Sequence, residues 1–357
     1  MTKKLKPSPF LLDCTLRDGS YPLNFKFTAK NTKSISFELD KLGFNYIEVG
    51  HGMGLGASRL KDVKASASDL DYMKAASAGV KKNKWGVFCI PGIAKLDDLR
   101  SAADCGAKFI RIGSDIENIK KTEGFIKLAK KLNLEVFANF MKSYTSPPKK
   151  FSLLASKSIS YGADAIYIVD SSGGMTQREL TNYILFTKDK IGEKKIGFHG
   201  HNNLGLAVAN SLRCYEENIF IIDTTLQGIG RSSGNTPSEQ FICALIRNGY
   251  DVKIDPIQLM NASEIFIRPL IKVKGISSLD TVSGLSQFHS SYMPIIIKNA
   301  FHFGIDPKEI IIELCKKTKN DAPINLIKSI SKRIQGKNNS RMSKMKFDPY
   351  YFGSEQK

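Results

Sequence analysis

The 357-residue chain lacks the features of a membrane protein, a secreted protein or a cysteine-based zinc site. It contains no run of 18 apolar residues, which excludes a predicted membrane-spanning helix. The N-terminal segment MTKKLKPSPFLLDC has lysines but no apolar stretch before its first β-like run, so we expect no secretory signal. The six cysteines are scattered without a C-x-x-C pair, which is typical of reduced thiols and predicts a cytoplasmic protein.

Acidic residues are few relative to basic ones. The chain has 53 lysines and arginines against 34 aspartates and glutamates, a formal net charge of +19. Such a charge can indicate a nucleic-acid surface, but the lysines are dispersed and no helix-turn-helix or RNA-binding signature is present. We interpret the charge as a solvated lysine surface that speeds the capture of anionic substrates, and expect no nucleic-acid partner.

β-like runs and helical spacing alternate regularly over the first 250 residues. Eight strand–helix units in about 250 residues predict an α/β fold, the (β/α)8 TIM barrel. A doubly wound open sheet is the alternative, but no G-x-G-x-x-G follows the first run. The runs of β-formers are 10–16, 45–50, 85–90, 108–112, 134–140, 164–170, 195–200 and 219–226.

After residue 255 helical spacing continues without β-like runs. We expect a catalytic barrel over 1–255, a helical C-terminal lid or docking domain over 256–334, and a basic, mobile tail over 335–357. The helical segments are 256–272, 286–303, 307–317 and 322–334.

Polar residues collect where the predicted strands end, and barrel active sites lie at the C-terminal ends of the strands. The sequence therefore predicts an arginine, a carboxylate, a serine and three histidines on one rim. They are Arg17 and Asp18 after the first run, His51 after the second, Ser171 after the sixth, and His199 and His201 at the seventh.

The segment FHGHNNLGLAVANS indicates a metal site. Because side chains alternate along a strand, His199 and His201 should point into the same cavity. Two imidazoles and the carboxylate of Asp18 make a facial site that suits Mn²⁺ or Mg²⁺, with Zn²⁺ as an alternative. Beside such an ion, Arg17 can hold an oxygen on which negative charge grows. The competing interpretation is a local Arg17–Asp18 ion pair that closes a turn.

The loop GIGRSSGNTPSEQF over 228–241 has two interpretations that the sequence leaves open. Its backbone N–H groups could bind an anion, as barrel phosphate sites do. Alternatively, Thr236 or Ser238 caps the helix that follows.

Five motifs together resemble the metal-dependent barrel lyases related to 3-hydroxy-3-methylglutaryl-CoA lyase, and among these the 4-hydroxy-2-oxovalerate aldolase family. The motifs are DCTLRDG, VGHGMGLGAS, ADAIYIVDSSG, FHGHNNLGLAVANS and IDTTLQGIGRSSGN. The resemblance extends from about residue 10 to 334, because FGIDPKEIIIELCKKTKNDAPINLIKSI is similar to the C-terminal helical domain of those aldolases.

The resemblance implies a divalent-metal-dependent, class II aldolase or lyase. It would cleave or form a C–C bond of a 4-hydroxy-2-oxo acid through a metal-bound pyruvate enolate. The implied metal ligands are Asp18, His199 and His201, with Asn235 completing the coordination sphere. Mn²⁺ is the metal we expect, with Mg²⁺, Co²⁺ or Zn²⁺ as alternatives.

The resemblance also assigns substrate contacts and partners. Arg17 would stabilise the enolate and Ser171 would bind the substrate carboxylate, and we expect His51 and His199 to contact the substrate as well. The substrates would be a small 2-oxo acid and an aldehyde. An acylating aldehyde dehydrogenase would dock through the C-terminal region, and we expect a homodimer.

Two positions depart from the family pattern. The general-base histidine three residues after the aspartate is Tyr21 here, and the tyrosine of the family's Tyr-Ser-Ser pattern is His289, in SQFHSSY. A phenol with a pKa of about 10 is a poor base at neutral pH, whereas an imidazole near 6.5 is well suited. We predict an exchange, with His289 as the base and Tyr21 as its hydrogen-bonding partner. The competing interpretation is that both positions drifted because the chain acts on another substrate or on none.

Two other functions are carried as alternatives. A Claisen-type acyltransferase of the same superfamily would condense acetyl-CoA with a 2-oxo acid. A barrel kept as a non-catalytic docking or nucleic-acid-binding scaffold is the second alternative.

Overall fold

The computed structural model describes residues 9–61, 63–271 and 278–335. Eight parallel strands close into a barrel in sequence order, with β8 paired to β1. This confirms the predicted fold, and each strand overlaps its predicted run. The strands are β1 (Phe10–Asp13), β2 (Tyr46–Val49), β3 (Lys84–Cys89), β4 (Phe109–Asp115), β5 (Glu135–Met141), β6 (Ala165–Asp170), β7 (Lys195–Gly200) and β8 (Ile221–Thr224).

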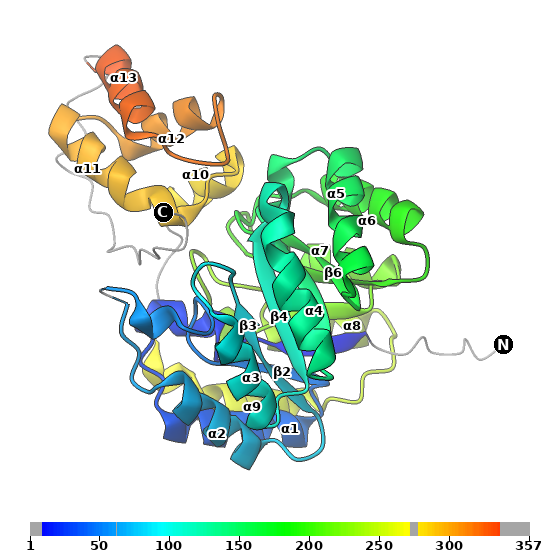
Figure 1. Ribbon diagram of the computed structural model, residues 1–357. Coiled ribbons are helices and arrows are strands. Elements are labelled where there is room, and N and C mark those ends of the chain that lie inside the picture. The colour runs from blue at the N-terminus through cyan, green and yellow to red at the C-terminus, as the bar shows by residue number, and fades with distance from the viewer. Residues whose placement is uncertain (1–8, 62, 272–277, 336–357) are drawn as a thin grey trace.

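The helices that follow the strands form the outer layer of the barrel (Figure 1). Three of them begin at a capping box, in which a hydroxyl accepts the N3 backbone N–H and the N3 side chain accepts the N-cap N–H. These N-caps are Thr28, Ser68 and Thr176. The helices are α1 (Ala29–Leu42), α2 (Asp69–Gly79), α3 (Leu96–Asp104), α4 (Glu123–Lys131), α5 (Pro148–Tyr161), α6 (Gln177–Ile191), α7 (Ala207–Glu216), α8 (Ser238–Arg247) and α9 (Pro256–Phe266).

The barrel interior holds an aromatic layer with a charged layer beside it. Four rings pack together with centroids 5.3 to 5.9 Å apart. Strands β2, β4 and β8 each carry a buried charged residue two positions beyond an apolar residue that points into the barrel. The period of two therefore places the charges in the next layer, toward the C-terminal ends of the strands. The aromatic residues are Tyr46, Phe109, Phe137 and Tyr167, and the charged ones are Glu48, Arg111 and Asp223.

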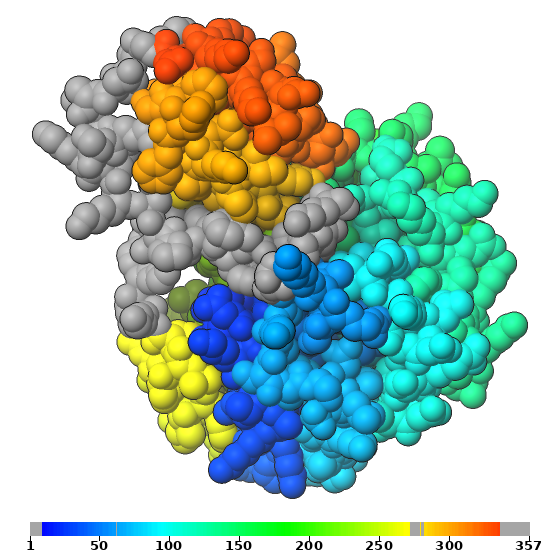
Figure 2. Space-filling view, turned by 60° about the vertical axis from the view of Figure 1, so that its left-hand side comes forward, coloured from blue at the N-terminus to red at the C-terminus, as the bar shows by residue number. Residues whose placement is uncertain are grey.

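The C-terminal helices form a second group with its own core, which we call the cap. It appears as the orange and red lobe in Figures 1 and 2. Its buried residues run from Leu279 to Ile334 and form a cluster separate from that of the barrel. The cap helices are α10 (Ser278–Ser286), α11 (Met293–Phe303), α12 (Pro307–Cys315) and α13 (Ile324–Ile334).

The boundaries in the C-terminal region differ from the predicted ones. Helix α9 ends at Phe266 and packs on α8 and α1, so its apolar side chains join the barrel core. We therefore place the domain division after α9 rather than after residue 255. The helix expected over 286–303 is broken at 287–292, where Gln287 has a positive φ of 55° and the chain makes a 3₁₀ turn. That break presents His289 to the barrel. From residue 336, the predicted tail lies outside the described residues.

Within the described part of the chain, the helices are too short or too polar to cross a membrane. All six cysteines are described as free thiols, in agreement with the absence of a disulfide pattern in the sequence.

Candidate metal and substrate site

Asp18, His199 and His201 are brought together at the C-terminal end of the barrel. Their ligand atoms all lie within 4.8 Å of one another, and the two imidazole centroids are 5.0 Å apart. Strand β1 ends at Asp13, three residues earlier than predicted, because the carbonyl of Cys14 accepts the N–H groups of the turn that follows. That turn lifts Asp18 to the rim, beside the histidines of β7.

The loop 228–241 delivers Asn235 to the same cluster. The Asn235 amide Nδ2 donates to Asp18 Oδ2 at 2.7 Å, and its backbone N–H donates to the carbonyl of Gly228. Gly234 has a φ of +87°, and a Cβ there would stand 2.0 Å from the Gly228 oxygen, so the loop requires glycine at this point. Several loop N–H groups bond carbonyls of the loop itself, and α8 begins at Ser238 after the N-cap Pro237, with no side-chain cap. The capping interpretation is therefore wrong, and the loop serves to place Asn235.

The residues present fit a divalent ion. His199 Nδ1 lies 2.8 Å from Asp223 Oδ2, and His201 Nδ1 lies 3.2 Å from the Gly234 carbonyl oxygen. Both partners only accept hydrogen bonds, so each ring donates from Nδ1 and presents the lone pair of Nε2. Asn235 Oδ1 is buried with no hydrogen-bond partner in the described chain. Two nitrogens and a carboxylate thus converge as a possible metal site, and the Asn235 side chain with its unpartnered oxygen adjoins it through Asp18.

Electrostatics favour the ligand forms of these groups. Burial would raise the pKa of Asp18, but the Arg17 guanidinium and the two imidazoles outweigh it and hold that pKa well below its usual range. Burial lowers the pKa of His201 to about 4, although Asp18 opposes this shift. At neutral pH, Asp18 is ionised and His201 is neutral, as metal ligands must be.

Arg17 lies beside the cluster and is anchored from behind. Its Nη1 donates to Asp18 Oδ1 at 2.6 Å, and its Nε donates to Glu48 Oε2 at 2.7 Å. The guanidinium carbon stands 4.7 Å from the Phe88 ring centroid. The local ion pair with Asp18 therefore exists, but Glu48 gives Arg17 a second anchor that is independent of Asp18.

Sequence reasoning missed the charged layer beneath the ligands. Arg111 Nε donates to Glu48 Oε1 at 2.7 Å, and Arg111 Nη1 pairs with Asp223 Oδ2. Each of these side chains is at most 1% exposed. The available signal was a single charge inside each apolar run YIEV, FIRI and IID, because a charge at such a position in a barrel strand needs a buried partner.

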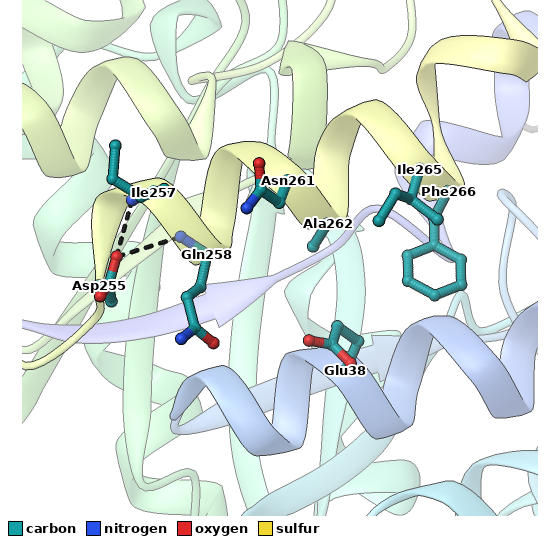
Figure 3. A pocket seen from close by; sticks show the side chains of 8 residues that line it. All are labelled: Glu38, Asp255, Ile257, Gln258, Asn261, Ala262, Ile265 and Phe266. Atoms are coloured by element: carbon teal, nitrogen blue, oxygen red, sulfur yellow. Dashed lines mark hydrogen bonds between the residues drawn. The ribbon is translucent and has the colours of Figure 1, made fainter.

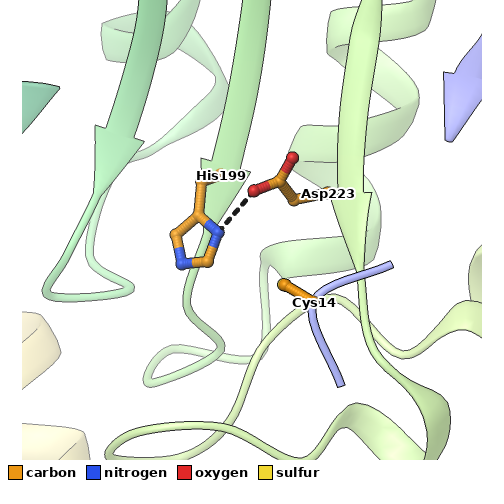
Figure 4. A group of neighbouring side chains, drawn as sticks. All are labelled: Cys14, His199 and Asp223. Carbon is orange, nitrogen blue, oxygen red and sulfur yellow. Dashed lines mark hydrogen bonds and ion pairs between the residues drawn. The ribbon is translucent and has the colours of Figure 1, made fainter. Parts of the chain in front are cut away.

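A second group of possible ligands, Cys14 with His199 and Asp223, is shown in Figure 4. Asp223 already engages His199 Nδ1. Burial and the negative charge of Asp223 raise the pKa of the Cys14 thiol well above its ordinary value. A metal would need the thiolate, so we assign Cys14 to the core.

Tyr21 and His289 are both buried, and Arg231 contacts the Tyr21 ring and Ser290, the residue next to His289. The Arg231 guanidinium carbon lies 5.0 Å from the Tyr21 ring centroid, and its Nε donates to Ser290 Oγ at 2.9 Å. His289 Nδ1 lies 2.7 Å from Ser291 Oγ. Burial, together with the charges of Arg231, Lys142 and His201, lowers the pKa of His289 well below its ordinary value. Sequence reasoning had not singled out Arg231.

Of the two remaining residues predicted to contact the substrate, Ser171 lies at the rim and His51 lies in a loop. Ser171 follows β6, is buried, and accepts the Lys142 backbone N–H at 2.9 Å. His51 Nδ1 accepts the Met53 N–H at 3.1 Å, and its Nε2 lies 2.9 Å from the Val63 carbonyl. Backbone groups engage both nitrogens of His51, so it orders its own loop, and this arrangement does not support a contact with the substrate.

The cap closes tightly over the loops that follow β6 and β7. A Cβ at Gly174 would stand 2.2 Å from the carbonyl oxygen of Gly284 in α10, and one at Gly284 would stand 2.9 Å from Leu204 Cγ. Lys142 Nζ adds a bond to the Asn320 carbonyl at 3.2 Å. The close approach of backbone to backbone therefore sets the depth at which His289 enters the site.

Replacing Gly174 by alanine is expected to push α10 away while leaving the metal ligands in place. A displacement of about 1 Å can cost about 10²-fold in rate. We expect kcat to fall by that order, with Mn²⁺ affinity unchanged within about threefold. Isothermal titration calorimetry and steady-state kinetics measure the two quantities. The matched control is Gly124→Ala in α4, where a Cβ meets nothing within 4 Å; an equal loss in both variants would contradict the proposed contact.

A groove of about 400 Å³ lies on the outside of the barrel, between α1 and α9 (Figure 3). It is lined by Glu38, Asp255 and six residues of α9. None of the residues at the strand ends lines it, so we regard it as a surface feature.

Comparison with known proteins agrees with this geometry. The sequence family described as HMGL-like matches residues 8–266, which ends with α9. The chain is 36% identical over 315 residues to the 4-hydroxy-2-oxovalerate aldolase of Carboxydothermus hydrogenoformans, covering 88% of this chain and 92% of that protein. It is 35% identical over 305 residues to the enzyme of the same name from Geobacillus genomosp. 3, covering 85% and 90%.

A solved structure supports the fold. The HMG-CoA lyase of Brucella melitensis superposes with a TM-score of 0.63 at 15% identity, covering 74% of this chain and 99% of that one. From the family match over residues 8–266 and from relatives that are 35–36% identical over 85–88% of the chain, the protein belongs to the HMGL-like family and is a carbon–carbon lyase of the aldolase type.

Proposed function

We propose that the chain cleaves a 4-hydroxy-2-oxo acid to pyruvate and an aldehyde, and catalyses the reverse addition. The observation that carries this proposal is the cluster of Asp18, His199 and His201 beside the anchored guanidinium of Arg17. A divalent ion held there, for which we propose Mn²⁺ with Mg²⁺, Co²⁺ or Zn²⁺ as alternatives, would supply Lewis-acid polarisation of the 2-oxo group.

The chain's own groups provide the remaining steps. A base removes the proton of the 4-hydroxyl, the C3–C4 bond breaks, and its electron pair forms the enolate of pyruvate while the aldehyde leaves. Arg17 donates to the enolate oxygen, because Glu48 keeps its guanidinium at the rim. Ser171 binds the substrate carboxylate through its hydroxyl. A proton returned to C3 completes pyruvate.

We assign the base to His289. In the structure, His289 Nδ1 accepts the Ser291 backbone N–H at 3.4 Å and lies 2.7 Å from Ser291 Oγ. To accept the substrate proton at Nε2, the ring must carry its own proton on Nδ1 and donate it to Ser291 Oγ when substrate is bound. The low pKa of His289 keeps it neutral at pH 7, and a bound anionic 2-oxo acid would offset the positive charges of Arg231 and Lys142 that weaken it. Tyr21, beside Arg231, would orient the hydroxyl that loses the proton.

Replacing His289 by alanine is expected to lower kcat by about 10² to 10⁴-fold, the usual contribution of a general base. Tyr21→Phe should cost less, about tenfold, because a hydrogen-bond partner contributes about 1 kcal/mol. Pyruvate release from 4-hydroxy-2-oxovalerate measures both. The control is His302→Ala, on the exposed face of α11 in the same domain. Full activity of His289→Ala would overturn the assignment.

The test of the function itself is product formation. Metal-stripped protein, restored with Mn²⁺, should convert 4-hydroxy-2-oxovalerate or related 2-oxo acids to pyruvate, with the aldehyde identified by mass. Thiol release from acetyl-CoA that depends on a 2-oxo acid would instead favour the Claisen-type alternative. Salt-sensitive nucleic-acid binding without metal binding would favour the scaffold alternative.

The partner predictions stand as proposals that follow from the family resemblance of the sequence. We propose that an acylating aldehyde dehydrogenase receives the aldehyde through the cap and that the chain forms a homodimer. Co-purification with such a dehydrogenase and light scattering of the isolated chain would test them. The expected cytoplasmic location also stays a prediction.

A further inference from the structure

His199 is connected to Glu48 through two buried charged residues that the proposed reaction does not use. Asp223 Oδ2 lies 2.8 Å from His199 Nδ1 and also pairs with Arg111 Nη1. Arg111 then donates from Nε to Glu48 Oε1 at 2.7 Å and from Nη2 to Glu48 Oε2 at 2.5 Å. Side chains from β2, β4, β7 and β8 thus form one chain of bonds across the barrel.

Stability alone does not explain this arrangement. Removing charges from water costs several kcal/mol per ion, and apolar side chains of similar size often serve a buried layer equally well. The neighbouring layer is in fact aromatic, and the Arg111 guanidinium carbon stands 5.0 Å from the Tyr167 ring centroid. An arginine with no exposed surface therefore needs another reason to lie beneath the site.

The charge balance of the network favours a cation above it. Three carboxylates face two guanidiniums in this network, which leaves one net negative charge among these five side chains. Burial would raise the pKa of Glu48, but Arg111 and Arg17 outweigh it and lower that pKa to about 2. The carboxylates are those of Asp18, Glu48 and Asp223, and the guanidiniums are those of Arg17 and Arg111.

The geometry also fixes the proton of His199. A carboxylate accepts hydrogen bonds only, so the ring donates from Nδ1, and the neutral ring then keeps its lone pair on Nε2. Arg111 holds the same oxygen of Asp223 from β4, which prevents the carboxylate from turning away. With an amide in place of the carboxylate, its NH₂ could face Nδ1, and the ring would then carry its proton on Nε2.

We propose that Asp223 and Arg111 are positioning residues that hold His199 in the Nδ1–H tautomer and aim Nε2 at the metal. The catalytic consequence rests on the proposed metal-dependent function, whereas the tautomer is a property of the metal-free chain. The two can therefore fail separately.

The direct test is ¹⁵N NMR of the metal-free, full-length protein labelled at histidine. The chain has five histidines, and His199→Gln assigns the signal of interest. In the wild type, His199 should be protonated at Nδ1. A wild-type spectrum that shows the proton on Nε2 would by itself overturn the proposal.

Asp223→Asn should move the His199 proton to Nε2 and weaken Mn²⁺ binding about 10 to 100-fold, the usual cost of losing such a partner. Arg111→Lys, which keeps the charge but cannot bridge two carboxylates, should keep the tautomer and weaken Mn²⁺ binding about tenfold. The control is Glu135→Gln at the opposite end of the barrel, where Glu135 pairs with Lys84 at 2.8 Å.

Retention of both the tautomer and the Mn²⁺ affinity in Asp223→Asn would overturn the positioning role. If the wild type is nevertheless active, this result for Asp223→Asn leaves the proposed function intact. A wild type that has the Nδ1–H tautomer but neither binds Mn²⁺ nor cleaves a 2-oxo acid would instead overturn the proposed function alone.

Discussion

Replacing Asp18 by asparagine is expected to reduce aldol cleavage by at least about 10³-fold, because metal polarisation contributes several kcal/mol and each 1.4 kcal/mol is a factor of ten. The substitution keeps the shape of the side chain and its contact with Asn235, but removes the only carboxylate of the ligand cluster in the described chain. Mn²⁺ affinity, measured by calorimetry, should fall in parallel with activity.

The control for this loss of charge is Asp97→Asn in α3, whose side chain is 91% exposed. It should leave both activity and Mn²⁺ affinity unchanged. Because Arg17 retains Glu48 when Asp18 is neutral, the Asp18→Asn protein should still fold. A folded Asp18→Asn protein with wild-type Mn²⁺ affinity would show that the metal binds elsewhere.

Replacing Arg17 by lysine is expected to lower kcat by about 10² to 10³-fold, the usual effect of removing one donor to a developing oxyanion. Lysine keeps the positive charge but lacks the fork that lets Nε hold Glu48 while Nη1 faces the site. Mn²⁺ affinity should change by less than about tenfold, since Arg17 supplies no metal ligand.

The separation between kcat and metal affinity distinguishes Arg17 from Asp18. Stopped-flow or steady-state rates at saturating Mn²⁺ provide the measurement. Arg59→Lys, at an exposed ion pair with Asp98, is the matched control and should behave as wild type. A kcat for Arg17→Lys within a factor of two of wild type would exclude Arg17 from the stabilisation of the enolate.

The sequence predicted the parts of the structure that depend on local periodicity. The alternation of side chains along β7 placed His199 and His201 on one side, and their ring centroids are indeed 5.0 Å apart. The rule that barrel sites lie at the C-terminal strand ends correctly brought Asp18 to the same rim. Both inferences required only the position of a residue within its strand.

What the sequence could not predict depends on contacts between distant strands. Arg111 looks like an isolated charge in FIRI until the closed barrel brings it to Asp223, which is 112 residues away. Helical spacing alone likewise does not show that α9, which the prediction assigned to the C-terminal domain, packs on the barrel helices α8 and α1. His51 was expected to contact the substrate at the rim, whereas its ring nitrogens bond backbone groups of its own loop.

The predicted exchange of Tyr21 and His289 could be only partly derived from the sequence. The sequence identified both substitutions, and the structure adds Arg231, which contacts the Tyr21 ring and bonds Ser290, the residue next to His289. This contact supports a shared pocket. The kinetic comparison of the two single variants decides whether the histidine has taken over the role of the base.

The central claim is that Asp18, His199 and His201 hold a metal that lets this chain form the enolate of pyruvate. Exchange of pyruvate methyl protons with D₂O, followed by ¹H NMR, tests it without knowledge of the aldehyde. We expect exchange with Mn²⁺-loaded wild type, and none above background with metal-stripped protein or with Asp18→Asn. Exchange that persists without metal, or that is unchanged in Asp18→Asn, would contradict the claim.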